Sequence, residues 1–163
     1  MDFKQITSFI KIEHTLFSLP FILVGFIVAN NQFNDLLDDK SIFNLDLIWI
    51  LVAGVGARGL AMTLNRIIDR EIDAANPRTA SRHLASGTMS MNTAWILAGI
   101  FLVMLLFGAG MLNEVALGMS GLPVLAFVVY PYTKRFTWLC HSWLGLCLGL
   151  APAGAWLAIA GDF

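Results

Sequence analysis

The chain alternates long apolar runs with short polar segments. A membrane-spanning helix needs about 20 mostly apolar residues, and the sequence offers candidates near 14–30, 47–68, 92–112, 115–132 and 137–160. Proline and glycine inside these runs are tolerated where membrane helices pack against one another. The pattern therefore predicts an all-α fold, a polytopic transmembrane helical bundle of about five helices.

Composition supports a protein that resides in lipid. Of the 163 residues, 58% are hydrophobic and 13% are charged, and the mean hydropathy is +0.75. These values lie outside the range of soluble domains. We expect one membrane domain over residues 1–163, in the inner (cytoplasmic) membrane, with no nucleic-acid partner. The first run lacks a small-residue cleavage pattern, so we expect a retained first span after a short interfacial segment at 1–11.

The distribution of basic residues predicts the orientation of the chain, because loops rich in lysine and arginine stay on the cytoplasmic side. With the N-terminus inside, the only basic residue in the outer segments is Lys40, and Arg58 lies within a span. The inner segments then hold Lys4, Lys11, Arg66, Arg70, Arg78, Arg82, Lys134 and Arg135. The N-terminus and the polar ends of the second and fourth spans are thus predicted to face the cytoplasm.

The polar end of the second span carries the most informative group of residues. Asn65, Asp69 and Asp73 have the spacing i, i+4 and i+8, which places them along one face of a helix. Oxygen ligands of this kind suit Mg²⁺, which is usually bound through one or two carboxylates plus substrate phosphates. One interpretation is a magnesium-diphosphate site. The other is a solvated helix end at which Arg66 and Arg70 neutralise the carboxylates.

Two sets of arginines could serve the same site. Arg58 lies within the second span on the face of Asn65, and an intramembrane arginine normally lines a polar cavity or pairs with a carboxylate. It could contact a diphosphate or hold two helices together as an ion pair. The loop at 76–87 adds Arg78 and Arg82, and guanidinium groups grip phosphate oxygens in bidentate fashion. A basic loop attracted to anionic lipid is the alternative.

The fourth span ends with an aromatic and basic pair. Tyr130 and Lys134 have the spacing i and i+4, so they share a helical face. Without other evidence, such residues are interpreted as part of the aromatic and basic belt at a membrane interface.

Four segments together carry a family resemblance. The runs HTLFSLPF, NRIIDREID, NPRTASRHLASG and YPYTKRFT resemble the N-terminal half of the UbiA-type membrane prenyltransferases. Within that family they are most similar to the 4-hydroxybenzoate polyprenyltransferase-like enzymes of ubiquinone and menaquinone biosynthesis. Two positions depart from the pattern: Arg66, where many members have an aspartate, and His83, where a proline often follows the arginine.

The resemblance implies a fold, a reaction and a set of site residues. Family members have nine transmembrane helices around a central cavity and a second aspartate-rich motif in the later half, so we expect this chain to be a truncated N-terminal portion. The reaction implied is Mg²⁺-dependent transfer of a polyprenyl group from an allylic diphosphate to an aromatic acid such as 4-hydroxybenzoate. The implied metal ligands are Asn65, Asp69 and Asp73. Arg58, Asn65, Arg82, Tyr130 and Lys134 are implied to contact the diphosphate or its surroundings, and Asp69, Asp73 and Lys134 are the implied catalytic residues.

Two other functions compete with this enzyme. The first is a non-catalytic membrane protein that retains only the first metal-diphosphate motif, and an enzyme would then require a partner that supplies the missing C-terminal half. The second is a lipid-head-group phosphotransferase, but the D-G-x-x-A-R run typical of that class is absent from the sequence. Because a single acidic motif leaves a diphosphate half-neutralised, we expect little transferase activity from the chain alone.

Overall fold

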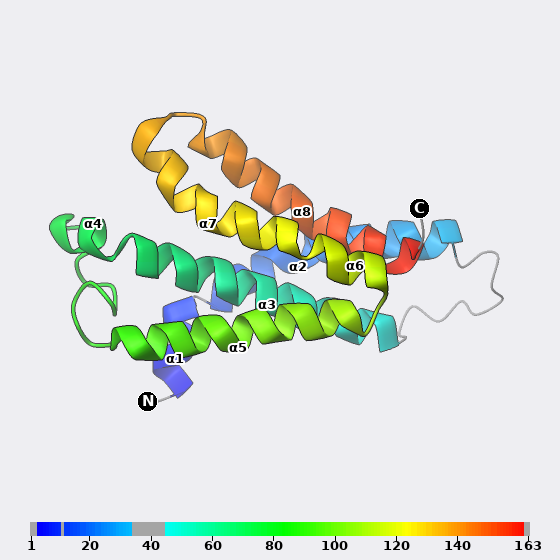
Figure 1. Ribbon diagram of the computed structural model, residues 1–163, viewed down its shortest axis with the longest axis horizontal. Coiled ribbons are helices and arrows are strands. Elements are labelled where there is room, and N and C mark those ends of the chain that lie inside the picture. The colour runs from blue at the N-terminus through cyan, green and yellow to red at the C-terminus, as the bar shows by residue number, and fades with distance from the viewer. Residues whose placement is uncertain (1–2, 11, 34–44, 162–163) are drawn as a thin grey trace.

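A computed structural model of the chain describes residues 3–10, 12–33 and 45–161, and the regular structure within them is helical (Figure 1). The elements are α1 (Phe3–Ile10), α2 (Ile12–Phe33), α3 (Leu45–Ile68), α4 (Arg70–Ala75), α5 (Met91–Gly110), α6 (Glu114–Met119), α7 (Gly121–Phe136) and α8 (Cys140–Ala160). The predicted all-α bundle is confirmed. Most of the polar loop expected before the second span lies outside the described residues.

Among the residues that the structure describes, four helical segments are long and apolar enough to cross a membrane. They are Leu45–Ile68, Met91–Gly110, Glu114–Phe136 and Cys140–Ala160, and they correspond to the second to fifth predicted spans. The third of these segments consists of α6 and α7, which meet at Ser120. The first predicted span falls in α2, where the apolar stretch Ser18–Phe33 is shorter.

Local sequence explains where two of the helices begin. The Ser90 side chain accepts a hydrogen bond from the Thr93 backbone N–H at 3.1 Å, which caps the first turn of α5. The Asn113 side chain caps α6 in the same way, through the Ala116 N–H at 2.6 Å.

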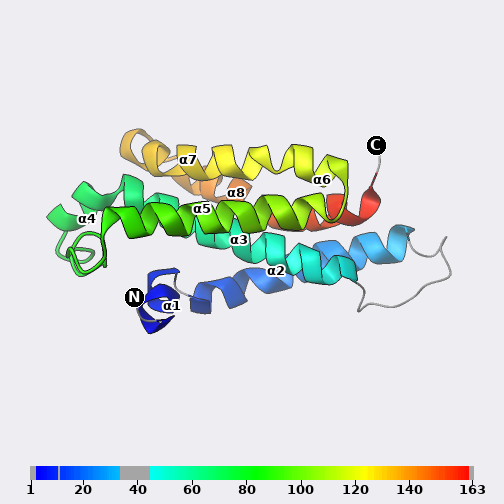
Figure 2. The same ribbon diagram turned by 60° about the horizontal axis from the view of Figure 1, so that its bottom comes forward.

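Helix α3 lies at the centre of the packing. It contacts α1, α2, α5, α7 and α8, and Figure 2 shows α5 running beside it along most of its length. Small residues allow this close approach. Gly56 of α3, for example, lies so near the α5 backbone that an added Cβ would be 2.5 Å from the Leu105 nitrogen. The polar residues of α3 are therefore held on a helix that is fixed on several sides.

The N-terminal helix α1 packs against the polar end of this bundle. Phe9 is fully buried and belongs to the same apolar cluster as Leu64 of α3, together with Leu84 and Met89 of the segment before α5. Helix α1, helix α4 and the turn between α7 and α8 all lie toward one end of the molecule (Figures 1 and 2). That end carries the candidate site.

Candidate active site

The three polar residues at the end of α3 lie one helical turn apart, as their spacing predicts. Helix α3 ends at Ile68, yet the helical hydrogen bonds continue across the junction with α4. The Asp69 N–H donates to the Asn65 carbonyl at 3.0 Å, and the Asp73 N–H donates to the Asp69 carbonyl at 2.8 Å. Asp69 and Asp73 are buried, with 1% and 6% of their surface exposed. Buried carboxylates require charged or hydrogen-bonding partners.

Asp69 receives its partners from the end of α7. The Lys134 ammonium forms a salt bridge with Asp69 Oδ2. A second cation, Arg135, places Nη2 3.4 Å from Asp69 Oδ1 and also donates to the Ile68 carbonyl at 2.9 Å. Residues 65 positions apart in the sequence therefore meet at one carboxylate, and the charged end of α7 is attached to the junction of α3 and α4.

Asp73 is paired with the loop that follows α4. Nη1 of Arg82 lies 2.9 and 2.8 Å from the two carboxylate oxygens of Asp73. The Thr79 hydroxyl donates to the Asp73 backbone carbonyl at 3.0 Å, which ties the loop to the same residue. In the part of the chain that the structure describes, Asp69 and Asp73 therefore form their salt bridges with cations that are distant in sequence. Their neighbours Arg66 and Arg70 do not form salt bridges with them.

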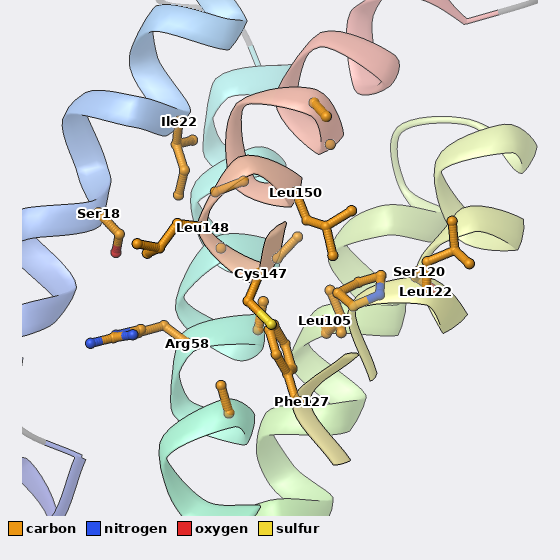
Figure 3. Close-up of a pocket in the computed structure, with 18 of the residues that line it drawn as sticks. Ser18, Ile22, Arg58, Leu105, Ser120, Leu122, Phe127, Cys147, Leu148 and Leu150 are labelled. Atoms are coloured by element: carbon orange, nitrogen blue, oxygen red, sulfur yellow. The ribbon is translucent and has the colours of Figure 1, made fainter. Parts of the chain in front are cut away.

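A cavity of about 600 Å³ is lined by residues of this charged end and of the apolar body of the bundle, and Figure 3 shows part of that lining. Its apolar walls come from α2, α3, α5, α6, α7 and α8 and include Ile22, Leu105, Phe127, Leu148 and Leu150. Its polar lining includes Arg58, Asn65, Arg82, Tyr130 and Lys134, which are the five residues that the family resemblance implied for substrate binding. Asp69 and Asp73 do not line the cavity but are ion-paired with Lys134 and Arg82, which do.

Arg58 enters the cavity wall from the middle of α3. Its side chain extends from α3 toward α2 and lies below Ser18 in Figure 3. Its Nε is buried, and among the residues that the structure describes it has no hydrogen-bond partner. The described side chains likewise include no ionic partner for Arg58, so an ion pair that holds two helices together finds no support there.

The charge and the donor atoms of the site suit an anion together with a hard divalent cation. The cations Arg58, Arg82 and Lys134 line the cavity, and such groups bind phosphate oxygens strongly. The oxygens of Asn65, Asp69 and Asp73 are the kind that Mg²⁺ prefers. Within the described ranges, no three histidine, cysteine or acidic side chains cluster closely enough to hold a metal by themselves.

Arg135 and Thr79 contribute to the site and were not assigned a role from the sequence, and Arg66, which the sequence offered only as a neutralising neighbour of the carboxylates, has a different contact. Arg135 follows Lys134 directly, and adjacent helical residues do not share a face, so nothing in the spacing indicates that both reach Asp69. Thr79 stands in the arginine-containing loop without a distinguishing signal. Arg66 is 95% buried, with its guanidinium carbon 4.9 Å from the centre of the Phe9 ring. That contact depends on where α1 packs.

Comparison with known proteins agrees with this geometry. The model of the UbiA prenyltransferase family matches residues 18–163. The chain belongs to the UbiA prenyltransferase family. Its family membership and its apolar helices make it an integral membrane protein.

Relatives of this UbiA family member include named enzymes. It is 33% identical to the 4-hydroxybenzoate octaprenyltransferase of Shewanella loihica, over 74% of this chain and 46% of the relative. It is 32% identical to the enzyme of the same name from Coxiella burnetii, over 66% of this chain and 42% of the relative. The chain thus spans somewhat less than half the length of these curated relatives.

Solved structures that resemble this chain also include a UbiA homolog. A UbiA homolog from Aeropyrum pernix K1, solved in its apo form, superposes with a TM-score of 0.80 and is 38% identical, covering 92% of this chain and 51% of that one. A digeranylgeranylglyceryl phosphate synthase superposes with a TM-score of 0.79 at 20% identity, covering 98% of this chain and 53% of that one. The second likeness concerns the fold alone.

Proposed function

We propose that this chain provides the diphosphate-activating part of an intramembrane prenyltransferase. The reaction is transfer of a polyprenyl group from an allylic diphosphate to an aromatic acid such as 4-hydroxybenzoate or a related quinone precursor. The observation that carries the proposal is the cavity that joins a cationic end to an apolar body. The cationic end suits the diphosphate, and the apolar body suits the isoprenoid chain.

The residues of the site have different proposed roles. Asn65, Asp69 and Asp73 are the proposed ligands of Mg²⁺, which would supply positive charge to the diphosphate as it leaves. Arg82 and Lys134 are the proposed donors to its oxygens. Fixed positive groups aimed at a developing negative charge stabilise the transition state more than the ground state.

The rest of the cavity protects the reacting carbon. As the bond to the diphosphate breaks, the allylic carbon becomes cation-like and an aromatic ring carbon attacks it. That ring carbon then loses its proton to the departing diphosphate or to water, which restores the aromatic ring. Apolar walls such as Phe127 and Leu148 exclude water that would otherwise capture the cation. Arg58 and Tyr130 add polar groups between the charged end and these walls.

The proposal includes the surroundings of the chain. Basic residues favour a cytoplasmic N-terminus and a cytoplasmic charged end of the bundle, in the inner membrane of the cell. Because the chain spans about half of its relatives' length, we propose that polypeptide corresponding to their remaining half completes the site. The competing interpretation is a non-catalytic membrane protein with one acidic motif, and it predicts no turnover even when the remaining half is supplied.

A chimera tests the proposed function. Residues 1–163 replace the corresponding part of the Shewanella loihica relative, and membranes holding the chimera receive labelled polyprenyl diphosphate, 4-hydroxybenzoate and Mg²⁺. We expect prenylated product from the chimera and little from the chain alone. Asp69→Ala should abolish product, whereas Glu71→Ala, a change at an exposed acid two residues away, should preserve it. If the Asp69→Ala variant still forms product, Asp69 does not belong to the site.

A further inference from the structure

Both acidic side chains of the candidate metal site already have cationic partners. Lys134 and Arg135 contact different oxygens of Asp69, and Arg82 contacts both oxygens of Asp73. The two carboxylates are almost fully buried. A free divalent cation must therefore compete with positively charged side chains for every carboxylate oxygen of Asp69 and Asp73. Leaving a charged partner unpaired in such surroundings is costly.

The cations that must be displaced face the cavity, and the carboxylates do not. Lys134 and Arg82 line the cavity, with about a third of each side chain exposed, 31% and 34%. If they leave the carboxylates, the groups that can pair with them are the oxygens of an anion in the cavity. A diphosphate carries such oxygens, and they form charge-assisted hydrogen bonds with lysine and arginine.

The third cation is held differently. Arg135 donates to the Ile68 backbone carbonyl at 2.9 Å, a bond that does not involve the carboxylate. The lysine ammonium, by contrast, is a compact charge on a flexible stem with rotatable donors. Movement of Lys134 alone can thus release one oxygen of Asp69 while Arg135 keeps α7 attached to the end of α3.

From these contacts we infer that Lys134 and Arg82 make this site selective for a divalent cation that arrives with a diphosphate, against the free cation. The inference rests on the proposed function and specifies its ligand as the metal-diphosphate complex. The cations that bind the diphosphate are those that the metal displaces, so each component favours binding of the other. Such coupling between two ligands is reciprocal.

Radioactive manganese provides a binding test that is independent of turnover. The full chain in lipid nanodiscs is dialysed to equilibrium against ⁵⁴Mn²⁺, in one arm alone and in the other with excess inorganic pyrophosphate. For the unmodified chain we expect on the order of tenfold tighter retention of manganese in the pyrophosphate arm. Lys134→Met and Arg82→Met should have opposite effects in the two arms. Retention of free manganese should rise about tenfold, because a competing charged hydrogen bond is lost, while retention with pyrophosphate should fall.

Two controls separate this effect from general electrostatics and from misfolding. Arg70→Met removes an exposed positive charge next to Asp69, and both arms should change by less than about threefold. Adding Asp69→Asn to Lys134→Met should abolish the gain for free manganese. Because a gain of specific binding does not arise from an unfolded chain, the first arm also reports that the variants are folded.

The outcomes distinguish the inference from the proposed function. If Lys134→Met and Arg82→Met both leave free manganese retention unchanged or lower it, the inference is wrong. The proposed function survives that result, provided that the pyrophosphate arm still retains manganese and Asp69→Asn abolishes the retention. If the unmodified chain retains manganese in neither arm, or if Asp69→Asn has no effect on the pyrophosphate arm, the proposed site and the inference both fail.

Discussion

The contact between α3 and α5 depends on glycine at positions where the two backbones nearly touch. A Cβ on Gly56 would lie 2.5 Å from the Leu105 nitrogen and 2.8 Å from the Phe101 carbonyl oxygen. A Cβ on Gly108 of α5 would lie 2.8 Å from the Ala53 nitrogen of α3. Favourable contacts between carbon atoms begin near 3.5 Å. Alanine at either position would therefore force the helices apart by roughly 1 Å, because backbone atoms cannot rotate away.

The cost of that separation sets the size of the expected effect. Overpacking a well-packed interior typically costs about 1–3 kcal/mol, whereas alanine in place of glycine contributes up to about 1 kcal/mol of helix propensity. We expect Gly56→Ala and Gly108→Ala each to lower the free energy of unfolding by about 1–2 kcal/mol. The double variant should cost less than the two changes added together, because the first alanine has already separated the helices.

Gly99 supplies a matched control on α5. A Cβ there meets nothing within 4 Å, and the residue is exposed. Gly99→Ala should therefore leave stability unchanged or raise it by up to about 1 kcal/mol. Unfolding of each variant in mixed micelles by increasing sodium dodecyl sulfate, followed by tryptophan fluorescence, measures the difference. If Gly56→Ala and Gly108→Ala unfold at the same detergent fraction as Gly99→Ala, close backbone packing does not hold these helices together.

Two further predictions concern contacts at opposite ends of the bundle. Asn113 caps α6 and donates to the carbonyls of the last turn of α8 at 2.9 and 3.3 Å, so Asn113→Ala should lower stability by about 1–2 kcal/mol in the same unfolding assay, and Asn113→Ser, which keeps the cap, should cost less. Phe9 packs between Arg66 and His83 beside the loop of Arg82, so Phe9→Ala should weaken manganese retention in the pyrophosphate arm. Ser8→Ala, a change at an exposed residue of the same helix, is the control. Equal retention in the two variants would show that α1 has no influence on the site.

The membrane helices were predictable because hydropathy depends on composition over a long window. The second span, expected at 47–68, is observed at Leu45–Ile68. The fourth was expected to end at 132, yet the helix continues to Phe136. Its last turn carries Lys134 and Arg135, whose charge is favourable at a helix C-terminus and is paired with Asp69. That pairing is a tertiary contact, which hydropathy cannot report.

The candidate site was predictable in its composition and only partly in its arrangement. Helical periodicity was sufficient to align Asn65, Asp69 and Asp73, because three residues separated by four positions share a face in any α-helix. Which cation meets which carboxylate depends on how α7 and the loop at 76–90 fold against α3. The sequence offers several arginines and lysines without ranking them, and the partners it suggested from proximity, Arg66 and Arg70, are not the ones that form the ion pairs.

The two positions at which the resemblance implied a departure from the family pattern, Arg66 and His83, meet at a single side chain. The guanidinium of Arg66 lies over the ring of Phe9 at 4.9 Å, and the His83 ring packs edge-on against the same phenylalanine, with ring centres 6.2 Å apart. Neither Arg66 nor His83 lines the cavity, whereas Asn65, beside Arg66 in the sequence, does. Arg66 and His83 thus face α1, and the donors that line the cavity are other residues. Replacing either residue removes a contact of Phe9, so the consequences should appear first in the packing of α1.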